Sequence, residues 1–160
     1  MKKYFAEMVG TMVLVLMGCG TAVSLSCGVD TASVVGTALA FGLSVVAMAY
    51  AIGGISGCHI NPAITFGVWL SKRMSGKDAL MYVLFQVIGA FIGAAILYAL
   101  APESGLGANS IQAGISTCGA VIAEVVFTFV FVLVVLGTTD EKKGAGNLAG
   151  LAIGLTLVLV

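Results

Sequence analysis

Polar side chains are rare in the long apolar stretches of this sequence, and two of the exceptions are carboxylic acids. Glu7 and Glu124 each stand in the pattern Ala-Glu-x-x-x-Thr. Carboxyl groups inside a membrane are costly to bury and usually mark a function. The chemistry open to them is a proton relay, or the acceptance of hydrogen bonds from nearby backbone N–H groups.

A second polar group lies in GGISGCHINPAITFGVW, residues 53–69, which combines His59 and Asn61 with Pro62. Asparagine is a favoured helix N-cap and proline suits the first helical position, so the stretch predicts a helix start at Asn61. An isolated histidine is more often structural than a ligand. An intramembrane enzyme or an ion-coupled transporter would need several interacting polar groups, and this single loop favours neither. We therefore assign no acid–base chemistry to His59.

The composition indicates where these residues must work. Hydrophobic residues make up 60% of the 160 residues and charged residues 9%, against about a quarter charged in soluble domains. The chain is therefore predicted to be an all-α membrane protein, with roughly 20 residues for each crossing. Five apolar segments qualify, at residues 4–25, 34–52, 79–100, 118–137 and from 148 onward. The fifth has only about 20 Å of helix before Val160, so we expect the natural protein to continue.

The basic residues predict the topology. All seven fall in three clusters, at residues 2–3, 72–77 and 142–143, whereas the connections near Asp30 and Glu103 carry none. The positive-inside rule makes these clusters cytoplasmic. Two crossings return the chain to the cytoplasmic side by residue 53, and the second cluster is cytoplasmic too. The segment between them must enter and leave by one face, as a re-entrant loop.

The re-entrant segment reads as a glycine-rich entry followed by a half-helix. Gly53, Gly54 and Gly57 allow backbone conformations closed to other residues, and a helix from Asn61 to Leu70 would be about 15 Å long, half a membrane. Non-helical backbone at that depth is tolerated where it lines water or protein. We expect the carbonyl groups of four residues to line a water path: Gly57, Cys58, His59 and Ile60.

An internal repeat divides the chain. The segment at Ala6, AEMVGTMVLVLMGCGTA, is similar to AEVVFTFVFVLVVLGTT at Ala123, and LAFGLSVV is similar to LAIGLTLV, pairing Gly42 with Gly154. The copies lie three spans apart, so they cross the membrane in opposite directions, as an inverted repeat. We predict a first repeat at residues 1–117, with three transmembrane helices and a half-helix at 61–71, and the start of a second at 118–160.

The two Ala-Glu-x-x-x-Thr motifs and Ser-Gly-x-His-x-Asn-Pro-Ala together resemble the aquaporin (major intrinsic protein) family, bacterial water-selective type, across the whole chain. The resemblance implies six tilted helices and two half-helices that meet at the midplane. It also implies a homotetramer in the inner (plasma) membrane, with a cytoplasmic N-terminus. The second half-helix, with its Asn-Pro-Ala and arginine, is missing from this chain.

The resemblance also implies residue roles. The Asn-Pro-Ala triplet, Asn61, Pro62 and Ala63, would cap the half-helix and offer amide N–H donors to passing water. Glu7 and Glu124 would support the two loops by accepting hydrogen bonds. Phe41 matches the filter position at which water-selective members carry phenylalanine and glycerol-conducting members carry tryptophan.

The expected function is a passive channel that conducts water in single file and excludes protons and ions. A facilitator of glycerol or other small neutral solutes is the alternative; an ion-coupled transporter or an intramembrane enzyme is disfavoured. The four cysteines have no metal-ligand spacing, and nothing resembles a nucleotide site, a redox centre or a nucleic-acid patch. We expect no cofactor, no metal ion and no enzymatic activity, with water and the lipid bilayer as partners.

Overall fold

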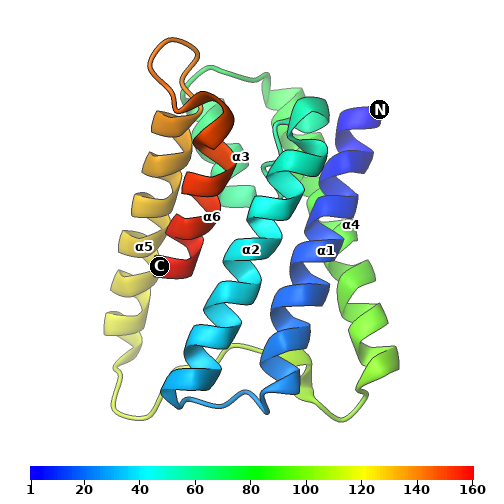
Figure 1. Cartoon of the computed structure of the whole chain (residues 1–160), viewed down its shortest axis with the longest axis vertical. Helices are drawn as coiled ribbons and strands as arrows, with labels where there is room; N and C mark the ends of the chain where they lie inside the picture. Colours follow the sequence, from blue (N-terminus) through cyan, green and yellow to red (C-terminus); the bar gives the residue numbers. More distant parts are fainter.

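The computed structural model describes all 160 residues and contains helices but no strands, which confirms the predicted fold class. Figure 1 shows the long helices side by side, with the N-terminus at the end where the loop between α5 and α6 also lies. The α-helices are α1 (Lys2–Ser24), α2 (Thr31–Ser56), α3 (Pro62–Leu70), α4 (Gly76–Leu100), α5 (Thr117–Thr138) and α6 (Ala149–Leu159). Two short 3₁₀ turns, η1 (Gly105–Gly107) and η2 (Gly146–Leu148), complete the structure.

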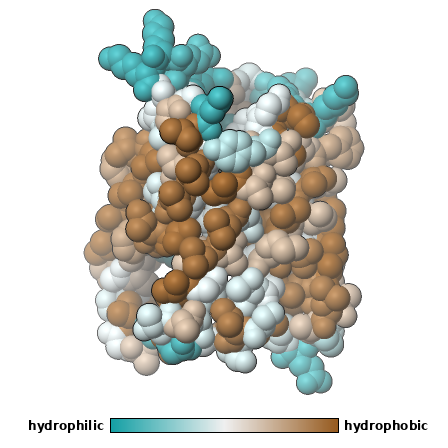
Figure 2. Space-filling view, in the orientation of Figure 1, coloured by the Kyte–Doolittle hydropathy of each residue, from teal (hydrophilic) through white to brown (hydrophobic).

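Four helices, α1, α2, α4 and α5, are long and apolar enough to cross a membrane. Only 22 of the 160 residues are buried, so most of the apolar side chains lie on the outside. Figure 2 shows them as a broad hydrophobic band between two hydrophilic ends. Such a surface is unfavourable in water and suits lipid. The chain is therefore a multi-pass membrane protein.

The second span differs from the prediction at both ends, because α2 begins at Thr31 and continues to Ser56. Gly53 and Gly54 are helical, so the expectation that they open the loop was wrong. The helix continues because the N–H of Gly57 still bonds to the carbonyl of Gly53, and Gly57 itself ends the helix with φ 83°. Glycine is common within transmembrane helices, and its presence alone did not mark the boundary.

The segment that connects α2 to α4, which contains α3, begins and ends at the same end of the molecule (Figure 1). At this end, Ser75 caps the start of α4 through a hydrogen bond to a backbone N–H group. Asp30 caps the start of α2 in the same way at the opposite end. At the same end as Ser75, Lys3 forms an ion pair with Asp78 at 2.8 Å. Arg73 there donates to the carbonyl oxygens of α5's last turn. The three basic clusters therefore share one end, as the re-entrant topology requires.

Helix packing positions the half-helix. α1 lies between α2 and α4, and α2 also packs against α6. α3 lies between α4 and α5, and its Ile64 and Val68 form a buried cluster with Phe131 and Val135 of α5. Close approach of α1 and α4 depends on glycine, because a Cβ on Gly93 would lie 2.7 Å from the carbonyl oxygen of Met12. Larger residues there would separate the helices.

Candidate functional site

The loop between α2 and α3 has an unusual backbone. Gly57, Cys58 and Ile60 have φ values of 83°, 51° and 42°, in the left-handed region that disfavours residues with a Cβ. Asn61 then returns to an extended conformation, with φ −154° and ψ 127°, as the N-cap of α3. Two non-glycine residues in the left-handed region imply that other parts of the protein hold this loop in place.

Glu7 supplies much of that support. Its Oε1 accepts hydrogen bonds from Ser56 Oγ at 2.7 Å and from the backbone N–H of His59 at 2.9 Å. Its Oε2 accepts from the backbone N–H of Ile60 at 2.6 Å and from Gln86 Nε2 at 2.8 Å. The carboxyl group is fully buried. All four partners are donors, so the geometry is that of a hydrogen-bond acceptor which orders the loop.

Sequence reasoning missed three residues of this network: Ser56, Thr65 and Gln86. Gln86 Nε2 also donates to Thr65 Oγ1 at 3.0 Å, so one amide group links α1, α3 and α4. Tyr82 donates its hydroxyl hydrogen to the carbonyl of Ser56 at 2.7 Å. A glutamine within an apolar span was the one available signal, because a polar side chain there needs a partner.

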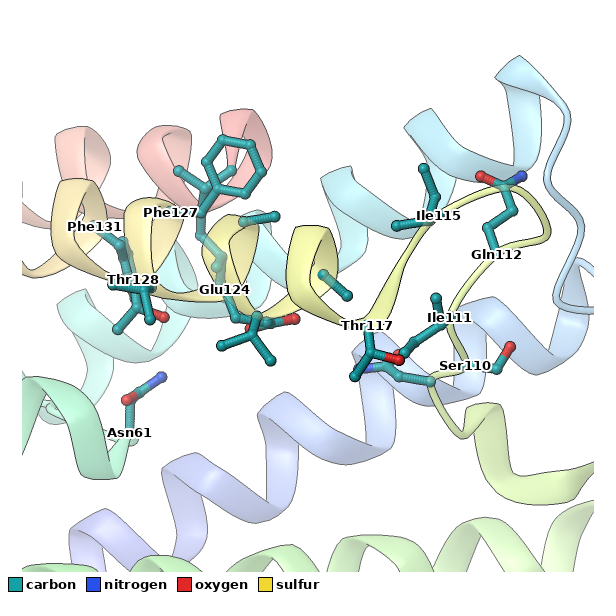
Figure 3. A pocket seen from close by; sticks show the side chains of 17 residues that line it. Asn61, Ser110, Ile111, Gln112, Ile115, Thr117, Glu124, Phe127, Thr128 and Phe131 are labelled. Carbon is teal, nitrogen blue, oxygen red and sulfur yellow. The ribbon is translucent and has the colours of Figure 1, made fainter.

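The oxygen and the nitrogen of the Asn61 side-chain amide group have different surroundings. Its Oδ1 accepts from the backbone N–H groups of Ala63 at 2.7 Å and Ile64 at 3.3 Å, and Pro62 occupies the first helical position. The side-chain nitrogen has no protein partner and points into an open hollow (Figure 3). The first turn of α3 also presents the partial positive charge of a helix N-terminus. The site therefore offers hydrogen-bond donors to a polar molecule in the hollow.

The hollow has a volume of about 760 Å³ and is lined mainly by α5 and the chain before it. Glu124 and Thr128 point from α5 toward the same space as the Asn61 amide, whereas Phe127 points away (Figure 3). Glu124 is exposed and accepts no hydrogen bond from the protein. It thus differs from Glu7, its counterpart in the repeat, which has four donors.

On the other side of the loop, two smaller cavities meet at His59. One of about 120 Å³ includes Gly57, Cys58 and His59, and one of about 220 Å³ includes His59 and Asp78; both reach Arg73. No hydrogen bond of the structure uses the carbonyl groups of residues 57–60. Of these residues, Gly57, Cys58 and His59 line the cavities, whereas Ile60 is buried. The Ile60 side chain is buried and faces Gly10.

Phe41 lines a fourth cavity, a hollow of about 520 Å³ between α2, the chain near Ala108 and the end of α6. Its ring is half-buried and lies directly over Gly18 of α1, where any side chain would collide with it. This hollow and the one beside Asn61 share lining residues, so the two adjoin. Its filter role stays a prediction.

The chain is similar to known proteins in sequence and in fold. The sequence model of the major intrinsic protein family matches residues 1–160. Proteins named Aquaporin Z from Photorhabdus laumondii, Rhodopseudomonas palustris and Bradyrhizobium diazoefficiens are 40%, 44% and 43% identical. The matches cover 100%, 99% and 100% of this chain and 74%, 70% and 71% of those proteins.

A solved structure adds the fold. The aquaglyceroporin from Plasmodium falciparum superimposes with a TM-score of 0.87 at 25% identity, over 99% of this chain and 70% of that one. The relatives are thus longer than the chain, while almost every residue of the chain has a counterpart in them. The chain belongs to the major intrinsic protein family, whose members are membrane channels for water or small solutes and not enzymes.

Proposed function

We propose that the protein conducts water in single file through the membrane while excluding protons and ions. The observation that carries this proposal is that the oxygen and the nitrogen of the Asn61 side-chain amide have different partners. Its Oδ1 is occupied by two backbone N–H groups, so its amide N–H groups are left for the hollow. A water molecule held there by its oxygen directs both hydrogens outward, which interrupts a continuous proton wire.

The path runs from the large hollow beside Asn61 to the small cavities beside His59. Along it, the unpaired carbonyl groups of residues 57–60 would accept hydrogen bonds from the water file. The positive end of α3 opposes hydronium and cations at the same depth. Donors at Asn61 and acceptors beside it together fix the orientation of each passing water.

A conduit for glycerol or another small neutral solute is the alternative, because the family includes the aquaglyceroporin that superimposes on this chain. Two features favour water. The relatives at 40–44% identity are named Aquaporin Z. In the sequence, Phe41 also matches the position at which water-selective members of the family carry phenylalanine rather than tryptophan.

We further propose that the large hollow seats a second half-helix. The repeat offset between Gly42 and Gly154 is 112 positions, and the same offset from Asn61 leads to about position 173. The second loop would bring donors to Glu124, as the first brings them to Glu7, and would add an arginine to the filter. A histidine soon after Val160 would fit a water filter opposite Phe41, whereas a glycine would favour glycerol.

The assembly is proposed to be a homotetramer in the inner membrane, with the N-terminus in the cytoplasm. The orientation rests on the three basic clusters, which share one end of the molecule. The positive-inside rule assigns that end to the cytoplasm. The reversal of charge in a cluster, such as Lys142→Glu with Lys143→Glu, would weaken that signal.

Vesicles that contain the natural full-length protein distinguish the two substrates. A hyperosmotic step with an impermeant solute measures water efflux, and an inward glycerol gradient measures glycerol entry by re-swelling. We expect fast shrinkage and re-swelling no faster than in empty vesicles. Fast re-swelling in glycerol would replace the water proposal with the glycerol alternative. Asn147→Asp, at an exposed residue of the 3₁₀ turn η2, serves as a matched control for the same substitution at Asn61.

A further inference from the structure

The Thr65 hydroxyl group is a fully buried junction of three contacts. Thr65 Oγ1 lies 3.1 Å from the carbonyl oxygen of Asn61, 3.0 Å from Gln86 Nε2 and 3.1 Å from His59 Nδ1. A hydroxyl group has one hydrogen to donate and two lone pairs to accept with. The three contacts therefore match its full bonding capacity, provided that one partner accepts and two donate.

Two of the three directions are fixed by the partners. The carbonyl oxygen of Asn61 can only accept, so the Thr65 hydrogen must point to it. Gln86 must present its NH₂ group rather than its oxygen, because the same nitrogen donates to the carboxylate of Glu7. One lone pair of Thr65 thus receives a hydrogen from Gln86. The remaining lone pair faces His59 Nδ1 and needs a donor.

The opposite arrangement breaks a contact. If Nδ1 carried no hydrogen, the Thr65 hydroxyl group would have to donate to it. The oxygen atoms of Thr65 and Asn61 would then face each other at 3.1 Å with no hydrogen between them. Buried polar groups are almost always hydrogen-bonded. Only the form of His59 with its proton on Nδ1 turns all three contacts into hydrogen bonds.

The other ring nitrogen, Nε2, faces the cavities. Nε2 has no hydrogen-bond partner in the protein. The one side-chain nitrogen or oxygen atom that is both buried and without a partner is Gln86 Oε1, so Nε2 is not buried. It is therefore accessible from the cavities that His59 lines. Tyr82 holds the ring from one side, with the ring centroids 5.0 Å apart. A neutral ring with Nδ1–H leaves Nε2 as a bare acceptor.

We propose that Thr65 is a positioning residue that selects the Nδ1–H tautomer of His59 and so turns Nε2 into a hydrogen-bond acceptor for water on the path. Asn61 donates to the oxygen of one water, and Nε2 accepts a hydrogen from a water farther along. On the His59 side, both contacts therefore direct water hydrogens away from Asn61. This consequence rests on the proposed water conduction, whereas the tautomer itself does not.

Nitrogen NMR of the full-length protein in lipid, labelled with ¹⁵N at histidine, tests the tautomer. His59 is the only histidine among these 160 residues, and the loss of its signal in His59→Asn assigns it in a longer chain. At pH 8, above the ordinary histidine pKa of about 6.5, we expect one protonated nitrogen, identified as Nδ1 by its couplings to the ring protons. A protonated Nε2, alone or together with Nδ1, would overturn the proposal.

Three variants test the role of Thr65. Thr65→Val keeps the shape but removes the acceptor, and we expect the Nδ1–H signal to be lost; Thr65→Ser restores the hydroxyl group and should restore the signal. Thr138→Val is the matched control, because Thr138 also donates to a carbonyl four residues earlier but lies far along α5. Persistence of Nδ1–H in Thr65→Val would overturn the role of Thr65. Water permeability, measured in parallel, tests conduction separately.

Discussion

Gly42 of α2 and Gly154 of α6 face each other so closely that a Cβ built on either one would lie 2.5 Å from the carbonyl oxygen of the other. The sequence repeat pairs these same two glycines. Equivalent helices of the two repeats thus cross at their equivalent residues, as two copies related by a twofold axis would. The crossing ties the α5 and α6 pair to the rest of the molecule, because α2 and α6 form its main contact.

Gly42→Ala should therefore destabilise the protein. The new methyl group meets backbone, which cannot rotate away, and overpacking of this kind typically costs about 1–3 kcal/mol. Gly54→Ala is the matched control, since Gly54 lies in the same helix with nothing within 4 Å of a Cβ. Unfolding in detergent with increasing denaturant measures both. Equal midpoints for the two variants would show that the crossing tolerates a methyl group.

Glu7→Gln should be poorly tolerated and Glu7→Ala should be worse. Four donors converge on the carboxylate, and each buried donor left unpaired costs about 1–3 kcal/mol. The amide group of glutamine keeps one acceptor oxygen but turns its NH₂ group toward other donors. Protease resistance of the loop and water permeability should fall together. Glu103→Gln, in an exposed loop, should change neither.

The Glu7 variants also decide between the two chemistries first considered for this carboxyl group. A structural acceptor predicts loss of loop order in the alanine variant at every pH. A proton relay predicts a normally folded alanine variant that has lost only a pH-dependent activity, and this result would replace our interpretation.

Modification of Cys58 should block the channel. Its thiol belongs to a residue that lines the 120 Å³ cavity, so a small methanethiosulfonate reagent attached there would obstruct the path. The experiment uses a protein in which Cys19, Cys27 and Cys118 are alanine, since Cys27 and Cys118 are exposed. Water permeability should fall on treatment. Cys58→Gly, which suits the φ of 51°, should conduct and resist the reagent; unchanged permeability of labelled Cys58 would place the path elsewhere.

The sequence was informative wherever one residue type serves one local purpose. Asn61 and Pro62 predicted the start of the half-helix, since capping depends only on the adjacent backbone. The apolar spans and the basic clusters predicted the topology, because the bilayer imposes both. The prediction that Gly53 and Gly54 open the loop was wrong, since glycine permits a turn but does not require one.

The Glu7 network could not be assembled from the sequence. Its members come from α1, the end of α2, α3 and α4, and Gln86 lies 79 positions from Glu7. Their proximity follows from helix rotation and depth, which apolar patterns do not specify when nearly every face is apolar. For the same reason the left-handed conformations of Cys58 and Ile60 had no sequence signal, since the loop is held by acceptors on Ser56 and Glu7 that are brought together only in the folded structure.

Water and proton fluxes, measured on the same vesicles over a range of protein contents, test the central claim most directly. Light scattering after an osmotic step reports water, and an internal pH dye reports protons after a pH step. For the natural full-length protein we predict that water permeability rises with protein content while proton permeability stays at the value of empty vesicles. A proton flux that rises with protein content, or a water permeability that does not, would contradict the account.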